Sequence, residues 1–348
     1  MTDIPIEKLL FSNFVKYDRL KIISDRAFSK TNASELNIYI DLNSMLKSIY
    51  SQDILGMTSL TYISSFVVNI CSHYRHFYRT RYRVKTNIFI VYSENIPHLN
   101  SQFYKDYNKN TKARLKTNTQ VKDFIYDNIE LLKLLVPYLP NIYFVEGTYE
   151  TGVLINHIIK TRGLNIPNMI ISKDSYLFQL VSLYDNTIVL RPKKSNGQDL
   201  SYYIHKDNLL TALLKLRNST EDLQGVSPEL ASIFMTLTYV KERNIKSLVN
   251  VKTAVKSIKD GINDKTLYNG HSVNPTTIWN GLNTKAFNTE SFNFECRYKA
   301  IDIPFQYSVF VNSPEVLNIR FIDLYDLKAL EEINSKYFNT NPLDLDGL

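Results

Sequence analysis

The chain has 348 residues, of which 44% are hydrophobic, and it carries a formal net charge of +7. Such a length and composition support a sizeable core and exclude a chain that is disordered throughout. No apolar run is long enough to cross a membrane, and the two cysteines are too few for a disulfide framework or a zinc cluster. We therefore expect a cytoplasmic protein with no membrane contact. The basic charge fits a nucleic-acid ligand, and it equally fits a solvated basic surface.

Up to about residue 205, short apolar runs alternate with helical patterns. Runs rich in Ile, Val and Phe predict strands over 37–43, 86–92, 141–147, 168–172 and 186–192. Amphipathic segments between them predict helices over 58–83, 121–139, 150–163 and 175–184. Apolar strands separated by helices are typical of a parallel sheet that is covered on both faces and joined by right-handed crossovers. The pattern therefore predicts an α/β domain.

Beyond about residue 206 the pattern becomes helical, with predicted helices over 206–218, 227–240 and 251–262. We expect four parts. They are an N-terminal arm, the α/β domain, a helical C-terminal region and an acidic-apolar tail, over residues 1–35, 36–205, 206–340 and 341–348.

Three acidic residues fall at or just after the ends of predicted strands, namely Asp41, Glu150 and Asp174. The carboxyl ends of parallel strands share one edge of a sheet, where ligands bind, so these side chains should converge there together with Ser93. Carboxylate oxygens are the ligands that Mg²⁺ prefers. Asp41 and Asp174 also suit a second role, because an aspartate between a strand and a helix caps that helix.

The order of four segments carries a family resemblance. "IYIDLNSMLKS", "FYKDYNKNTKARLK", "LPNIYFVEGTYETGVLINHI" and "NMIISKDSYLFQLVS" resemble successive motifs of the 5′-nuclease family, the flap endonucleases and 5′–3′ exonucleases. Within that family the likeness is greatest to the ribonuclease H enzymes of T4-type bacteriophages, over roughly residues 36–260. The resemblance implies a PIN-like, mostly parallel central sheet flanked by helices. It also implies a role in DNA replication or repair in the cytoplasm of a phage-infected host cell.

The acidic positions are where this sequence departs from the family. Asp41, Glu150 and Asp174 are kept, and the resemblance makes them the candidate catalytic and Mg²⁺-binding residues. At the family's other acidic positions the chain has Ser93, Gly152, Val153, Tyr176, Val240 and Arg243. Two Mg²⁺ ions about 4 Å apart need more carboxylates than remain. We therefore favour a nuclease-fold protein with little or no activity. One alternative is an active Mg²⁺-dependent 5′–3′ exonuclease or ribonuclease H, and another is a structural subunit of a phage assembly.

The segments that the resemblance assigns to nucleic-acid binding match the family better than the acidic positions do. "FYKDYNKNTKARLK" lies where the resemblance places a segment that grips the substrate, and lysines and arginines neutralise phosphates while tyrosines stack on bases. Its candidate binding residues are Tyr104, Lys105, Tyr107, Lys109, Lys112 and Arg114. The resemblance thus implies a junction or flap DNA as partner, and a solvated loop is the other interpretation.

Three further segments carry weaker signals. "ERNIKSLVNVKTAVKSI" resembles the family's helix-hairpin-helix in degenerate form, since its hairpin has no glycine, although Lys252 and Lys256 remain to contact phosphates. The arginines of "SHYRHFYRTRYR", with spacing i, i+4 and i+8, form a basic stripe or an exposed helix face. The tail "PLDLDGL" resembles peptides that dock on sliding clamps or other replication proteins, and it also suits a frayed end.

Overall fold

A computed structural model describes most of the α/β region and parts of the remainder. The described residues are 14–28, 33–46, 62–93, 119–238, 240, 247–263, 268–269, 272–273, 297–312, 319–320 and 326–337.

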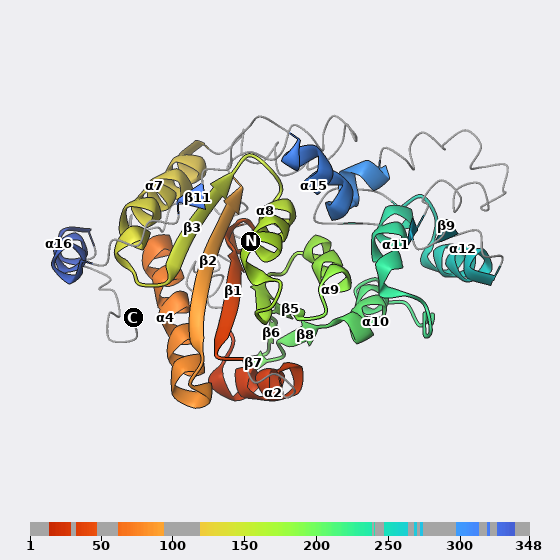
Figure 1. The fold of residues 1–348 in the computed structure, drawn as a ribbon, viewed down its shortest axis with the longest axis horizontal. Helices are drawn as coiled ribbons and strands as arrows, with labels where there is room; N and C mark the ends of the chain where they lie inside the picture. Colours follow the sequence, from red (N-terminus) through yellow and green to blue (C-terminus); the bar gives the residue numbers. More distant parts are fainter. Residues whose placement is uncertain are drawn as a thin grey trace.

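A seven-stranded sheet lies at the centre of the described chain, with strand order β11-β3-β2-β1-β4-β5-β8 (Figure 1). The five inner strands are parallel, and the two outer strands β11 and β8 pair antiparallel with their neighbours. The strands span, in sheet order, Ile319–Arg320, Ile142–Gly147, Lys85–Ser93, Glu35–Asp41, Asn168–Ile171, Thr187–Arg191 and Tyr202–Ile204. The prediction of a mostly parallel sheet in an α/β fold is confirmed, and the five predicted strands are the five inner ones.

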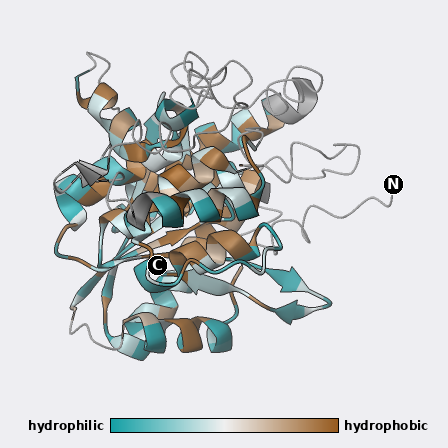
Figure 2. Cartoon of the chain, turned by 90° about the vertical axis from the view of Figure 1, so that its right-hand side faces the viewer, coloured by the Kyte–Doolittle hydropathy of each residue, from teal (hydrophilic) through white to brown (hydrophobic). Residues whose placement is uncertain are grey.

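Helices cover both faces of the sheet (Figure 1). One face packs on α2, α3, α4 and α7, which span Tyr17–Ala27, Leu42–Leu46, Tyr62–Tyr82 and Thr119–Leu135. The other face packs on α8 and α9, which span Thr151–Ile158 and Leu180–Leu183. The buried cluster on that side continues through α10, α11, α12 and α15, which span Leu209–Lys215, Ala231–Leu237, Val251–Asn263 and Ile303–Val311. A further helix, α16, spans Leu327–Tyr337. Several helices in Figure 2 carry both apolar and polar residues, as expected of helices with one face on a core.

The alternation of side chains along the strands produces two separate cores. In β1, Ile38 and Ile40 face the α4 side, whereas Tyr39 between them faces the α8 side. In β2, Ile88 and Ile90 follow the first pattern and Phe89 the second. Because both faces of each inner strand are buried, these strands read as continuous apolar runs rather than alternating ones.

The helical C-terminal region shares a core with the sheet. Leu209, Ile233 and Val255, from α10, α11 and α12, belong to the same buried cluster as Tyr39 of β1. The part of the chain that the structure describes holds no helix that is long and apolar enough to span a membrane.

The segment before β1 contains a docked helix, α2, which the sequence pattern did not predict. The ring of Tyr17 stacks on His73 of α4, with centroids 4.3 Å apart, and the ring nitrogen Nε2 of His73 lies 2.9 Å from the Val15 carbonyl. Burial lowers the pKa of His73 to about 4, so this histidine is neutral at physiological pH and serves packing.

Candidate functional site at the carboxyl ends of the strands

The predicted site residues lie at or just after the carboxyl ends of the parallel strands: Asp41 ends β1, Ser93 ends β2, Glu150 follows β3 and Asp174 follows β4. Asp41 ends β1 opposite Val91 of β2, and Ile40 pairs with Ile171, the last residue of β4. Asp41 is 2% exposed, and Glu150 and Asp174 are each 5% exposed. The three candidate carboxylates are therefore all buried side chains on the loops and strand ends at this edge.

Hydrogen bonds tie Asp41 to the turn after β4. The Ser172 hydroxyl donates to Oδ2 of Asp41 at 2.6 Å and accepts from the Asp174 backbone N–H at 2.9 Å. The other carboxylate oxygen of Asp41 accepts from the Ser44 backbone N–H at 3.0 Å. Asp41 thus joins the start of α3 to the β4 turn.

Asp174 caps the short 3-10 helix Ser175–Gln179, as its position between strand and helix predicted. Its Oδ1 accepts from the backbone N–H of Tyr176 at 3.0 Å. Glu150 stands at the N-cap position of α8, where its backbone carbonyl accepts from Val153 and Leu154 at 2.8 and 3.2 Å. The Glu150 carboxylate makes no capping hydrogen bond. Two of the three candidate acids therefore hold backbone groups in place.

Asn43 links three elements at this edge, and the sequence pattern did not single it out. Its Nδ2 donates to the Ser93 carbonyl at 2.9 Å, and its Oδ1 accepts from the Ser93 N–H at 2.7 Å and from the Thr151 hydroxyl at 3.2 Å. Both partners are uncharged. The only sequence signal is an amide two residues after the strand-end aspartate, which helix capping alone would explain.

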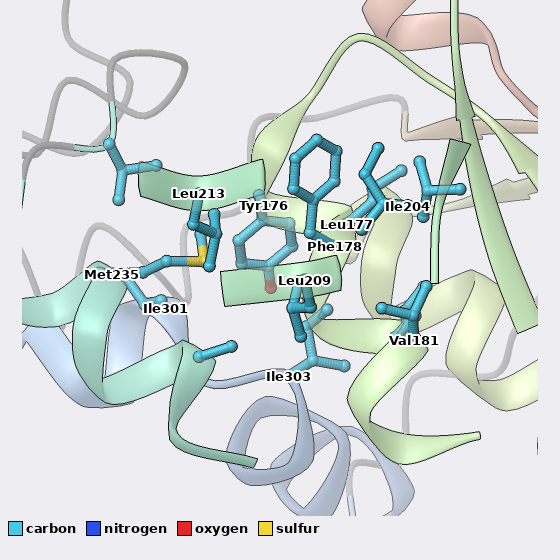
Figure 3. Packing of buried hydrophobic residues seen from close by; sticks show 14 of the residues in the cluster. Tyr176, Leu177, Phe178, Val181, Ile204, Leu209, Leu213, Met235, Ile301 and Ile303 are labelled. Atoms are coloured by element: carbon cyan, nitrogen blue, oxygen red, sulfur yellow. The ribbon is translucent and has the colours of Figure 1, made fainter. Parts of the chain in front are cut away.

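Gly152 and Tyr176, at two positions where the resemblance implies acids in the family, fit against each other. A Cβ added at Gly152 would lie 2.7 Å from Cε1 of Tyr176 and 2.9 Å from Cδ1 of Ile303. The Tyr176 ring is fully buried among apolar side chains, as Figure 3 shows. Its hydroxyl donates to Oε1 of Gln306 in α15 at 2.7 Å. The small residue therefore makes room for the large one.

Two more positions where the resemblance implies acids in the family lie in the same buried cluster. Val153 is 1% exposed and Val240 is fully buried, and both belong to the apolar core that includes Tyr176. An aspartate at either position would be a buried charge in an apolar environment, which is costly unless it is paired. Arg243 lies outside the described residues.

Lys173, between Ser172 and Asp174, adds positive charge to this edge. Burial, together with the nearby cations Arg191 and Lys194, lowers the pKa of Lys173 to about 8. Its backbone N–H donates to the Ser44 hydroxyl at 3.1 Å. Glu146, at the end of β3, pairs instead with Lys133 of α7, at 2.7 Å between Nζ and Oε1.

The residues at this edge do not fit a metal pair. Within the described ranges, no group of three or more His, Cys, Asp or Glu side chains lies close enough to hold a metal ion. Asp41 and Asp174 already direct carboxylate oxygens at hydroxyl or N–H donors, and a metal would compete for those oxygens.

The structure reaches only part of the predicted nucleic-acid interface. Lys252 and Lys256 lie on the exposed face of α12, opposite the buried Ala254, Val255 and Ile258. Oδ1 of Asn250 accepts from the Thr253 N–H at 2.8 Å, so Asn250 caps α12. The predicted substrate-gripping residues, the first half of the helix-hairpin-helix segment and the tail 341–348 all lie outside the described residues.

Comparison with known proteins gives no match at the level of sequence: no protein-family model matches the chain, and no curated protein does. Solved structures do match. A flap endonuclease of bacteriophage T5, in a pseudo-enzyme–product complex with DNA and metal ions, has a TM-score of 0.52 and 14% identity. The match covers 86% of this chain and 99% of that one. The T5 protein co-crystallised with metal ions gives a TM-score of 0.51 at 13% identity, covering 88% and 99% of the two chains.

The matches extend over nearly the whole length of the T5 enzyme. At this low identity the likeness concerns the arrangement of elements and not the side chains at the site. The chain thus has the α/β PIN-like fold of the 5′-nucleases, as its ordered motifs predicted.

Proposed function

We propose that this protein binds branched or flapped DNA and has little or no nuclease activity, acting in the replication or repair of phage DNA. The fold supplies the framework of a flap endonuclease. The basic charge of +7 suits a polyanionic ligand. DNA and metal ions are ligands of the T5 enzyme in its crystals, and we carry only the DNA over to this chain.

The observation that carries this proposal is the fit of Tyr176 against Gly152. A carboxylate cannot be restored at residue 152 without moving the buried tyrosine ring, since even a Cβ there would lie 2.7 Å from it. Val153 and Val240 fill neighbouring parts of the same apolar core. We infer that side chains fill the space where the resemblance places a second metal site. Asp41 and Asp174, whose carboxylates hold serine and backbone donors, act as structural groups.

An active Mg²⁺-dependent 5′–3′ exonuclease or ribonuclease H is the second candidate. It is favoured by one observation, the burial of Asp41, Glu150 and Asp174 at the carboxyl edge of a nuclease fold. A structural subunit, whose fold serves protein contacts alone, is the third. The tail 341–348 is our candidate contact for a sliding clamp or another replication protein.

Junction binding should depend on salt and on the basic segment at 104–116. We expect a labelled 5′-flap duplex to be retarded by the protein at low salt, with an affinity that falls steeply as salt rises, because bound cations are released from the phosphates. The double variant Lys105→Ala with Arg114→Ala should weaken binding about tenfold or more. Electrophoretic retardation across a salt series measures both effects.

A matched control comes from the described helix α2. Lys21 and Arg26 are exposed there, and replacing both by alanine removes the same charge from a segment outside the predicted binding residues. If both double variants weaken binding equally, the effect is one of net charge. Absence of any retardation at low salt would leave the structural-subunit candidate.

A further inference from the structure

A basic groove lies at the opposite end of the sheet from the acidic edge. It has a volume of about 510 Å³ and is lined by the end of α4, the start of β2 and the residues before β3, namely Arg75, Arg79, Arg83, Val84, Lys85, Thr86, Pro140 and Asn141. Lys85 is the first residue of β2, and Asn141 directly precedes β3. The groove therefore opens at the amino ends of strands β2 and β3.

Four cations and no acid line this groove. The buried Arg75 is anchored by a hydrogen bond from its guanidinium to the Pro140 carbonyl. In the described part of the chain, no carboxylate forms an ion pair with Arg79 or Arg83. Lys85 approaches Glu35 at 3.9 Å, an exposed pair of little energetic consequence. Arg79 and Arg83 thus contribute positive charge to the groove without a carboxylate partner among the described residues.

A buried hydroxyl in the lining lacks a partner. Thr86 is 3% exposed, and its Oγ1 is a buried atom that makes no hydrogen bond within the described part of the chain. Its side chain lies on the same face of β2 as Ile88 and Ile90, the face that α4 covers. A buried polar group without a partner costs free energy, so it points to a ligand that would accept from it.

The backbone at Arg83 is a third indication. Arg83 directly follows α4 with φ of 55°, and the next residue, Val84, donates its N–H to the Tyr78 carbonyl at 3.3 Å, which closes the end of the helix. That left-handed position favours glycine, and a long side chain is strained there. An arginine in an unfavourable backbone conformation on the rim of a basic groove suggests that its charge contributes to binding a ligand.

We propose that this groove binds a phosphate group. Guanidinium groups bind phosphate with paired charge-assisted hydrogen bonds, and the Thr86 hydroxyl supplies one more donor. A nucleic-acid strand and a free nucleotide both offer this group. The site is distinct from the acidic edge and does not depend on the function proposed above.

The test compares two charge-matched double variants of the full chain. Arg79→Gln with Arg83→Gln removes two groove cations, whereas Arg26→Gln with Arg81→Gln removes two exposed arginines that do not line the groove. The probes are a labelled 20-nucleotide thymidine strand, followed by anisotropy, and a nucleoside triphosphate without Mg²⁺, followed by calorimetry. The groove variant should lose about tenfold or more in affinity for at least one probe, and the control variant should lose less than about twofold.

The two probes separate the sources of the phosphate. Loss of affinity for the thymidine strand identifies a nucleic-acid strand as the ligand. The slope of log K against log salt concentration should then be shallower by about 1.4, because two phosphate contacts are lost. Loss for the triphosphate alone identifies a nucleotide. Equal losses in the two double variants, no loss in either, or no binding of either probe would overturn the proposal.

A near-isosteric variant separates binding from folding. Thr86→Val keeps the shape of the side chain and removes the hydroxyl. Because that hydroxyl lacks a partner without ligand, Tm should not fall, while affinity for the bound probe should fall several-fold. A lower Tm with unchanged affinity would contradict the role of this hydroxyl.

Discussion

Replacing Gly152 by aspartate is expected to lower the free energy of unfolding by about 3–5 kcal/mol, because it combines overpacking with an unpaired buried charge. The added Cβ would lie 2.7 Å from the Tyr176 ring and 2.9 Å from Ile303. The carboxylate beyond it would enter a core in which the described neighbours are apolar. Urea unfolding, followed by circular dichroism, measures the change.

Gly152→Ala isolates the steric part of that effect. Within a helix, alanine in place of glycine should stabilise by up to about 1 kcal/mol, whereas overpacking costs about 1–3 kcal/mol. We expect net destabilisation with Tyr176 present and a neutral or stabilising effect in a Tyr176→Leu background, where the ring is gone. If the two changes are additive within about 0.5 kcal/mol, the two residues do not compete for space and the interpretation is wrong.

The second large effect is expected at Asp41. Asp41→Ala removes the acceptor of both the Ser172 hydroxyl and the Ser44 N–H. The free energy of unfolding should therefore fall by about 2–4 kcal/mol. Asp41→Asn keeps one carbonyl acceptor, so its free energy of unfolding should fall by less. Unfolding of the three proteins in urea without added metal gives the comparison.

The sign of this effect separates a structural from a catalytic acid. Carboxylates gathered for metal binding repel one another when no metal is present, so removing one tends to stabilise the protein. Higher stability of Asp41→Ala than of the unmodified chain would therefore favour the active-nuclease candidate.

Much of the fold could be predicted from local patterns. The inner strands are continuous Ile- and Val-rich runs because both of their faces are buried, and such runs are visible in sequence. The outer strands β8 and β11 are short, and β11 has only two residues, Ile319–Arg320, so neither leaves a periodic signal. Helix α2 was missed because its docking depends on rings that meet across the chain, such as Tyr17 on His73.

The site could be predicted only in part. The capping role of Asp174 follows from its place between a strand and a helix, and the structure confirms it. The fit of Gly152 against Tyr176 could not be predicted, because the Tyr176 hydroxyl is held by Gln306, 130 residues away along the chain. The two replacements looked like independent losses in sequence, and they are neighbours that share one space.

Cleavage of a labelled 5′-flap duplex and of an RNA–DNA duplex, in Mg²⁺ and at high protein concentration, tests the central claim most directly. We expect binding without cleavage, because Tyr176 and its apolar neighbours fill the positions where the resemblance places further acids. Asp174→Asn should then leave the cleavage level unchanged. Mg²⁺-dependent cleavage that Asp174→Asn abolishes would contradict the proposal and establish the active nuclease.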